Sequence, residues 1–282
     1  MLSLSVVIIT FNEEKCLEHC LRSVKPLADE IIILDSGSTD RTPDIGRAFG
    51  AKVYYQKFKG YIEQKNDALR LATNNFILSL DGDECLDATL ATSILKAKYQ
   101  QSARAYSMNR STNFCGRFLR HGLWYPDRKI RLFDRRIVKW GGRNPHDRII
   151  VNKGTMVQHL PGDILHYSFE GLEDLMERNN RISKIAARSL HDDGVRSSWY
   201  KLLIHPAWAF INGYFFKRGF LDGFEGLSFA VNSAFQVFLK YARLYRLEKK
   251  ETELTNLPAT AAKTGPTSET GSLEALTLLK TT

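Results

Sequence analysis

The chain has 282 residues, of which 43% are hydrophobic and 25% charged, a composition that excludes a disordered or fibrous protein and allows one or two domains. No apolar run reaches the roughly 18 residues that a membrane-spanning helix needs, which excludes a multi-pass membrane protein. The net charge is +9, from 40 Lys and Arg against 31 Asp and Glu. The excess positive charge lies within residues 101–150, so it does not serve the solubility of the chain as a whole.

The N-terminal apolar stretch runs directly into Asn12 and Glu13 and has no basic region before it, so we expect no signal peptide. The four cysteines form no disulfide framework, which predicts reduced thiols in a cytoplasmic protein. Cys16 and Cys20 lie one helical turn apart, and without a second pair they fit small core residues better than a metal site.

The first ninety residues predict an open, mostly parallel sheet. Four β-branched runs without polar alternation are typical of strands buried on both faces, namely Leu4–Thr10, Glu30–Asp35, Ala51–Tyr55 and Phe76–Leu80. Helical spacing separates these runs, at Glu13–Val24, Thr42–Phe49 and Tyr61–Ala72. Asp40 is the expected N-cap of the second helix, and Gly50 its left-handed end. The alternation predicts βαβ units and therefore an α/β fold.

Residues 86–165 predict a small mixed or antiparallel extension that completes the sheet, because short apolar pieces alternate with Gly and Pro. The charge excess lies here, since residues 101–150 hold ten Arg and two Lys against three Asp. Such a cluster raises the local concentration of an anionic partner, and a solvated basic face is the alternative interpretation.

Residues beyond 165 predict helices. Ser168–Ser189 has helical spacing, and the stretches Leu202–Phe216 and Gly226–Leu239 contain no charged residue but are flanked by Lys and Arg. Both stretches are too short to span a bilayer, and their aromatic residues are typical of helices that lie in the headgroup region. A helical pair that merely covers the core is the alternative. The Thr-, Ala- and Gly-rich tail beyond Glu251 predicts weak structure.

Polar residues follow the predicted strands, at the edge where ligands of parallel sheets bind. The first strand ends in Thr10, Asn12 and Glu13, the second in Asp35, and the fourth in Asp81-Gly82-Asp83. Two carboxylates one residue apart are hard oxygen ligands for Mg²⁺ or Mn²⁺ that leave positions open for a substrate diphosphate. A turn without metal is the alternative for the Asp-x-Asp motif, and capping or turn formation is the alternative for Asp35, Asn12 and Glu13.

Two common nucleotide-binding classes are disfavoured. No Gly-x-Gly-x-x-Gly follows the first strand, as a dinucleotide-dependent dehydrogenase requires, and no Gly-Lys-Ser/Thr is present, as a P-loop nucleotidase requires.

Four segments, in this order and spacing, resemble a family-2 glycosyltransferase of GT-A fold, namely Ser5–Glu14, Ile33–Asp40, Gln64–Leu69 and Leu80–Glu84. Later segments resemble a subgroup that adds sugars to the lipopolysaccharide inner core, of the β-1,4-glucosyltransferase type, namely Arg131–Phe133, Gly142–Asp147 and Gly219–Leu227. The resemblance spans about residues 4–248 and omits the tail.

The resemblance implies roles for individual residues. A uridine nucleoside would be held by Thr10, Asn12, Glu13 and Asp35. Lys65 and Asn66 would lie near the base and diphosphate, Asp81 would approach the ribose beside the metal, and Asp83 would coordinate the Mg²⁺ or Mn²⁺ ion.

Inverting enzymes of this kind use one carboxylate as general base on the acceptor hydroxyl, and by position this is Asp147. The subgroup is expected to carry Val-His-Glu where this chain has Pro145-His146-Asp147, so Asp127 and Asp134 are reserve candidates.

The resemblance also suggests contacts to the acceptor or the donor diphosphate, namely Arg128, Arg131, Trp124 and His146. Arg suits bidentate contact with the phosphates and carboxylates of a polyanionic lipid core, although Arg131 could instead hold the donor diphosphate. Trp124 could stack on a sugar or pack in the core, and His146 could orient the base or merely pack.

The sequence therefore predicts a metal-dependent, inverting glycosyltransferase that moves a hexose, with glucose and a UDP-sugar expected, to a lipopolysaccharide inner-core sugar. We predict a GT-A domain over residues 1–165, with a nucleotide-binding half at 1–90 and an acceptor half at 91–165, a membrane-interfacial helical region over 166–250, and a tail over 251–282. The expected location is the inner face of the cytoplasmic membrane.

Three alternatives stay open. Transfer to a polyprenyl phosphate or another surface polysaccharide would use the same donor motifs. A nucleic-acid-binding protein would use the basic segment, but it would leave the carboxylate turns unexplained, so no nucleic-acid partner is expected. A non-catalytic membrane scaffold of the same fold is the third.

Overall fold

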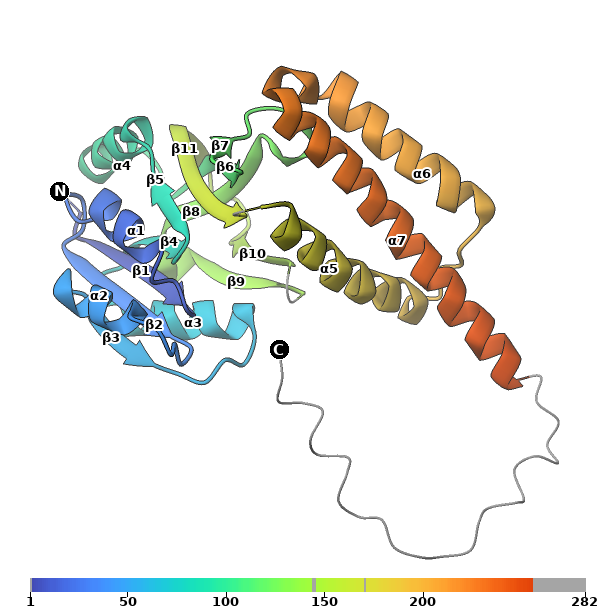
Figure 1. The fold of residues 1–282 in the computed structure, drawn as a ribbon. Helices are drawn as coiled ribbons and strands as arrows, with labels where there is room; N and C mark the ends of the chain where they lie inside the picture. The colour runs from blue at the N-terminus through green and yellow to red at the C-terminus, as the bar shows by residue number, and fades with distance from the viewer. Residues whose placement is uncertain (1, 144–145, 170, 256–282) are drawn as a thin grey trace, which may run out of the picture.

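The computed structural model describes residues 2–143, 146–169 and 171–255, and for residues 143, 146 and 252–255 it describes the backbone alone. An α/β domain comes first and three long helices follow it, extending to one side of the sheet (Figure 1). The predicted α/β class with a C-terminal helical extension is confirmed.

The first four strands are parallel, and they lie in the sheet order β3-β2-β1-β4. Their bounds are β1 Leu4–Thr10, β2 Glu30–Asp35, β3 Lys52–Tyr55 and β4 Phe76–Asp81, close to the predicted runs. The helices between them are α1 Leu17–Val24, α2 Thr42–Ala48 and α3 Tyr61–Leu71.

Two local predictions about these helices need correction. Helix α1 begins at Leu17 rather than at Glu13, because Asn12 has a left-handed backbone with φ of 55° that starts a turn after β1. The N-cap of α2 is Arg41 rather than Asp40, although the Asp40 carboxylate still accepts a hydrogen bond from the Thr42 amide. Gly50 has φ of 78°, as predicted for the residue that ends α2.

The second half of the domain is the predicted mixed extension. Strand β8 (Asp127–Asp134) is antiparallel to both β4 and β6 (Ala105–Phe114), and β11 (Val157–Phe169) is parallel to β6 and antiparallel to β5 (Glu84–Leu86). Residue 165, the predicted end of this domain, falls within β11. The remaining elements are α4 Ala88–Gln100, β7 Arg117–Phe118, a hairpin of β9 Val138–Arg143 and β10 His146–Val151, and the short helices η1 Gly122–Trp124 and η2 Arg135–Ile137.

Buried side chains cover both faces of the sheet. Along β1, Val6 and Ile8 pack on one face with residues of α1 and α4, whereas Val7 packs on the other with residues of α3 and β9. Continuous β-branched strands are therefore explained by burial on both faces. Helix α4 was not predicted, and Asp87 caps it by accepting a hydrogen bond from the Leu90 amide.

The C-terminal region consists of α5 Leu172–Asp192, α6 Trp199–Ile211, η3 Asn212–Phe216, η4 Gly219–Asp222 and α7 Gly223–Thr255. Phe229 of α7 packs against Phe114 and Phe169 of the sheet, which joins this region to the domain. None of the described helices combines the length and apolar character needed to cross a bilayer.

Candidate active site

The carboxyl ends of β1, β2 and β4 lie at one edge of the sheet. Thr10 is in register with Asp35 of β2, and Ile9 is in register with Asp81 of β4. Because the three strands are parallel and adjacent, their terminal polar residues are brought together, as their positions in the sequence suggested.

Asp35 holds the loops after β1 and β2 together. Its buried carboxylate accepts hydrogen bonds from the Thr10 hydroxyl at 2.8 Å, from the Ser38 hydroxyl and from the amides of Gly37 and Ser38. Asn12 joins the same loops, since its side-chain oxygen accepts a hydrogen bond from the Thr39 amide. The turn-forming roles left open for Asp35 and Asn12 are therefore present in the structure.

Three carboxylates crowd the turn after β4. A Cβ atom on Gly82 would lie 2.9 Å from Cγ of Glu13, so only glycine lets the turn carrying Asp81 and Asp83 approach this side chain. Burial raises the pKa of Glu13 to about 8, and the charges of Asp83, Asp81 and Asp40 add to the effect. The turn therefore favours either a proton on Glu13 or a cation nearby.

Lys65 of α3 joins this turn to Asp147 of β10. Its Nζ atom lies 2.9 Å from an Asp81 oxygen and 2.8 Å from an Asp147 oxygen, and it is 4.6 Å from the centre of the Trp140 ring. Asn66 exchanges two hydrogen bonds with the Trp140 backbone, which fixes the β9–β10 hairpin against α3. Neighbouring residues of one helix therefore position both the hairpin and its carboxylate.

Arg131 of β8 lies beneath the turn and is almost fully buried. Its guanidinium contacts Glu84 at 2.9 Å and Asp81 at 3.2 Å. Glu84 also accepts from the Asp81 amide and contacts Arg110, which in turn pairs with Asp127. Burial would raise the pKa of Asp81, but Lys65 and Arg131 outweigh it and hold that pKa well below its usual range.

Most cations of residues 101–150 are paired within the chain. Arg104 and Arg136 contact Asp134, and Arg117 and Arg120 contact carboxylates of other segments, Glu225 and Asp163. Four of these cations, Arg110, Arg117, Arg120 and Arg131, pair with carboxylates from outside the segment, so part of its charge excess is balanced by acids from elsewhere.

The suggested acceptor contacts lie in different places. Arg128 is exposed near His159, whose pKa is lowered by burial and by the Arg128 charge. Trp124 packs against Phe169 and Phe229, which corresponds to the core-packing alternative. The His146 side chain lies outside the described part of the structure.

The two reserve carboxylates are both paired with cations. Asp127 pairs with Arg110 and Lys129, and Asp134 is in register with Phe76, at the start of β4 and thus at the far end of the sheet from Asp81.

His166 was missed by the sequence analysis. Its Nε2 atom lies 3.1 Å from Asp83, and the Ser168 hydroxyl lies within 2.7 Å of both ring nitrogens. The Tyr167 amide also donates to the Asp83 carbonyl. No local motif marks this histidine, because only the docking of β11 brings it to the turn.

Asp83 and His166 fit a divalent cation. Carboxylate oxygen and imidazole nitrogen are donors that Mn²⁺ accepts, and Mg²⁺ is commonly bound by one or two carboxylates with substrate phosphates completing the shell. Among the described residues, no group of three or more His, Cys, Asp or Glu is arranged as a complete cage. A site completed by the substrate is therefore the arrangement that this donor set suits.

The sequence model of Glycosyl transferase family 2 matches residues 5–160, more than half of the chain. The chain belongs to this family. An uncharacterized glycosyltransferase of Rickettsia typhi is 31% identical over 261 residues, covering 89% of each chain. A lipopolysaccharide core biosynthesis glycosyltransferase, LpsC of Rhizobium meliloti, is 27% identical and covers 87% of this chain and 93% of its own length.

Solved structures give partial matches. Glucosyl-3-phosphoglycerate synthase of Mycobacterium tuberculosis is 24% identical, with a TM-score of 0.34, over 41% of this chain and 45% of its own. TarS of S. aureus is 23% identical, also with a TM-score of 0.34, over 39% of this chain and 22% of its own. Each match spans less than half of the solved chain.

Replacing Arg131 tests the buried charge network. Arg131→Met leaves the fully buried Glu84 with one cation, so the free energy of unfolding should fall by about 3–5 kcal/mol in urea denaturation followed by circular dichroism. The control Arg47→Met breaks the exposed pair with Asp44 and should change the free energy of unfolding by about 1 kcal/mol or less. Equal losses in the two variants would contradict the assigned role of Arg131.

Proposed function

We propose that this family-2 glycosyltransferase transfers a hexose from a nucleotide diphosphate sugar, with UDP-glucose the expected donor, to a sugar of the lipopolysaccharide inner core with inversion. The observation that carries the proposal is the Lys65 bridge, which puts Asp147 one side chain away from Asp81. The similarity to LpsC of Rhizobium meliloti supports this class of acceptor.

Asp147 is the proposed general base. It is largely buried, held by Lys65 and carried on a hairpin that packs against α3. In the proposed reaction its carboxylate takes the proton of the acceptor hydroxyl, whose oxygen bonds to the anomeric carbon. The bond from that carbon to the diphosphate breaks, and the electron pair leaves with the nucleotide.

Asp83 and His166 would hold the divalent cation, with Asp81 beside them. When bound, the ion stabilises negative charge on the departing diphosphate. The close approach of Glu13 to the turn that carries Asp81 and Asp83 supports this assignment, because a cation at the turn relieves the repulsion among the carboxylates. Arg131 is committed to Glu84 and Asp81, so we propose that it positions Asp81 and does not contact the donor.

Thr10, Asn12 and Asp35 are proposed to shape the nucleoside pocket. Their mutual hydrogen bonds define the loops after β1 and β2, beside the acidic turn. Asn66 would act indirectly, since its amide holds the Trp140 backbone.

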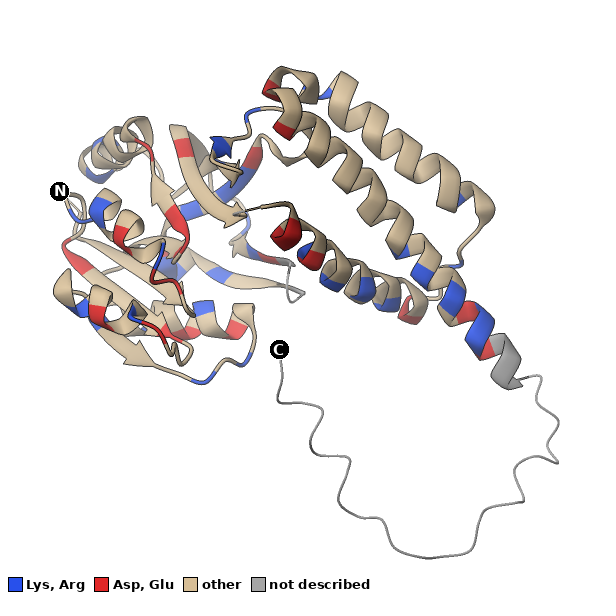
Figure 2. Ribbon diagram, in the orientation of Figure 1, with Lys and Arg blue, Asp and Glu red and all other residues tan. Residues whose placement is uncertain are grey.

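The exposed face of α6, η3 and the first part of α7 is proposed to lie on the inner face of the cytoplasmic membrane. Trp199, Trp208, Phe216 and Phe224 are each more than half exposed there. Figure 2 shows few charges along α6, with Lys and Arg gathered at the far end of α7. Aromatic side chains beside cations suit the headgroup region of an anionic leaflet.

Removing the Asp83 carboxylate should abolish metal-dependent donor binding. A ligand at about 100 times its Kd stabilises the folded protein by about 2.7 kcal/mol. For wild type we expect UDP to raise the Tm when Mn²⁺ is present, and we expect EDTA to remove this thermal shift. Asp83→Asn should lose the Mn²⁺-dependent part, whereas Asp44→Asn, an exposed change on α2, should keep it. An undiminished shift in Asp83→Asn would exclude this carboxylate as a ligand.

Removing the proposed base should separate turnover from binding. Asp147→Asn should lower the transfer rate by about 10²–10⁴-fold and retain the thermal shift with UDP and Mn²⁺. The control Asp127→Asn changes a carboxylate of the same network that is paired with Arg110, and it should retain most activity. If the rates rank in the opposite order, Asp127 is the base.

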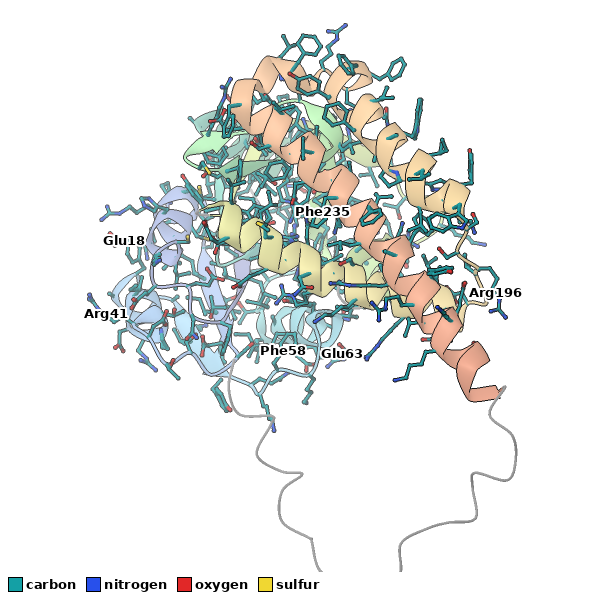
Figure 3. The ribbon with its side chains drawn as sticks, turned by 45° about the vertical axis from the view of Figure 1, so that its right-hand side comes forward. Glu18, Arg41, Phe58, Glu63, Arg196 and Phe235 are labelled. Carbon is teal, nitrogen blue, oxygen red and sulfur yellow. The ribbon has the colours of Figure 1, made fainter. Side chains whose placement is uncertain are left out.

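The membrane assignment predicts an effect of two exposed aromatic residues. Trp208→Ser/Phe216→Ser removes two rings that contact each other on the apolar face and should weaken flotation with phosphatidylglycerol vesicles by at least about tenfold. The control Phe58→Ser/Tyr99→Ser removes two exposed rings outside this face and should leave the flotation unchanged. Figure 3 shows Phe58 beside the α/β domain, away from α6. Equal flotation of both variants would argue against this face.

A further inference from the structure

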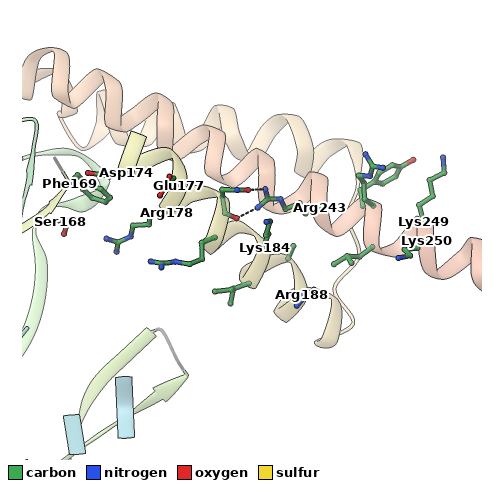
Figure 4. A pocket seen from close by; sticks show the side chains of 17 residues that line it. Ser168, Phe169, Asp174, Glu177, Arg178, Lys184, Arg188, Arg243, Lys249 and Lys250 are labelled. Carbon is green, nitrogen blue, oxygen red and sulfur yellow. Dashed lines mark hydrogen bonds between the residues drawn. The ribbon is translucent and has the colours of Figure 1, made fainter. Parts of the chain in front are cut away.

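A basic groove of about 1840 Å³ lies between α5 and α7 (Figure 4). Eight of its lining side chains are Lys or Arg and two are Asp or Glu. It is separate from the basic segment at residues 101–150, whose cations are mostly paired. The groove is therefore a concentration of positive charge that the charge counts of sequence segments do not reveal.

The cations of α5 form one stripe. Arg178, Arg181, Lys184 and Arg188 follow at intervals of three or four residues, which places them on one face of the helix. Like charges at this spacing repel and destabilise a helix. Asp174 and Glu177 line the same groove four residues before Arg178 and Arg181, so carboxylates offset the repulsion only at the inner end of the stripe.

The inner end of the groove adjoins the candidate active site. Ser168 and Phe169 line it, and the Ser168 hydroxyl contacts His166, which contacts Asp83. The Arg178 guanidinium lies 5.1 Å from the centre of the Phe169 ring. Burial lowers the pKa of Arg178 and the charge of Arg110 lowers it further, whereas the charge of Asp83 raises it, which places Arg178 within electrostatic reach of the acidic turn.

The outer end of the groove runs along α7 to Lys249 and Lys250. From Arg178 to Arg188 the stripe extends over about 15 Å of helix, at 1.5 Å per residue. One phosphate, such as that of a polyprenyl phosphate, would occupy only part of this length. A chain of several anionic groups would match it.

We propose that this groove binds the phosphates and carboxylates of a polyanionic, lipid-linked acceptor glycan and thereby guides its sugar to Asp147. This inference rests on the proposed function and specifies how the acceptor is recognised. Arg guanidinium groups bind phosphate and carboxylate in a bidentate manner, and the groove leads to the reaction centre, as an acceptor site must. The exposed aromatic face of α6 and α7 would meet the lipid part.

The test measures flotation with three kinds of phosphatidylcholine vesicle. The first carries deep-rough lipopolysaccharide, the second the same lipopolysaccharide after chemical dephosphorylation, and the third phosphatidylglycerol at matched charge. Wild type should prefer the first to the other two. Arg181→Ala/Lys184→Ala should lose that preference by about tenfold or more, because each cation near an anionic surface contributes appreciably and alanine preserves the helix.

The matched control is Lys96→Ala/Lys153→Ala, which removes two exposed cations outside the groove and should bind as wild type. The proposal is overturned if the groove variant keeps the wild-type preference, or if it loses binding to phosphatidylglycerol vesicles equally, which would indicate general headgroup attraction. Flotation requires no donor, so its outcome is independent of the thermal shift with UDP and Mn²⁺ that tests the donor half of the proposed function.

Discussion

The ion pairs of Lys65 are the interaction on which the site depends. Strand ends bring carboxylates to one edge, and without cations they would repel one another and resist burial. Lys65 enters from α3 and contacts both Asp81 and Asp147, while Arg131 enters from β8 and contacts Asp81. Both cations lie over the Trp140 ring. The result is an alternating network, with Glu84 fully buried between Arg131 and Arg110.

The same balance leaves Glu13 and Asp83 at the open side of the turn. The charge of Asp83 contributes to the raised pKa of Glu13, and the His166 ring contacts the Asp83 carboxylate. Cations of the chain thus hold Asp81 and Asp147 in position, whereas Asp83 is the carboxylate proposed to bind a cation from solution. A division of this kind separates the parts of a site that must stay fixed from those that meet the substrate.

The basic residues divide in a similar way. Those of residues 101–150 look like a ligand-binding segment in the sequence, yet Arg110, Arg131 and their neighbours are used inside the protein. A second group of cations lines the groove between α5 and α7, where eight Lys and Arg side chains meet only two carboxylates, Asp174 and Glu177. Net charge per segment is thus a poor guide to surface charge, since pairing depends on which residues the fold brings together.

By itself, the sequence determined the α/β class, the first four strands, the family and the acidic turn, because β-branched runs, glycines and short motifs act over a few neighbouring residues. Only the tertiary structure decided that Lys65 joins Asp81 to Asp147, that His166 meets Asp83, and that Trp124 packs in the core. These contacts link segments far apart in the chain, and their formation depends on sheet order and helix docking. No local pattern of residue types encodes that arrangement.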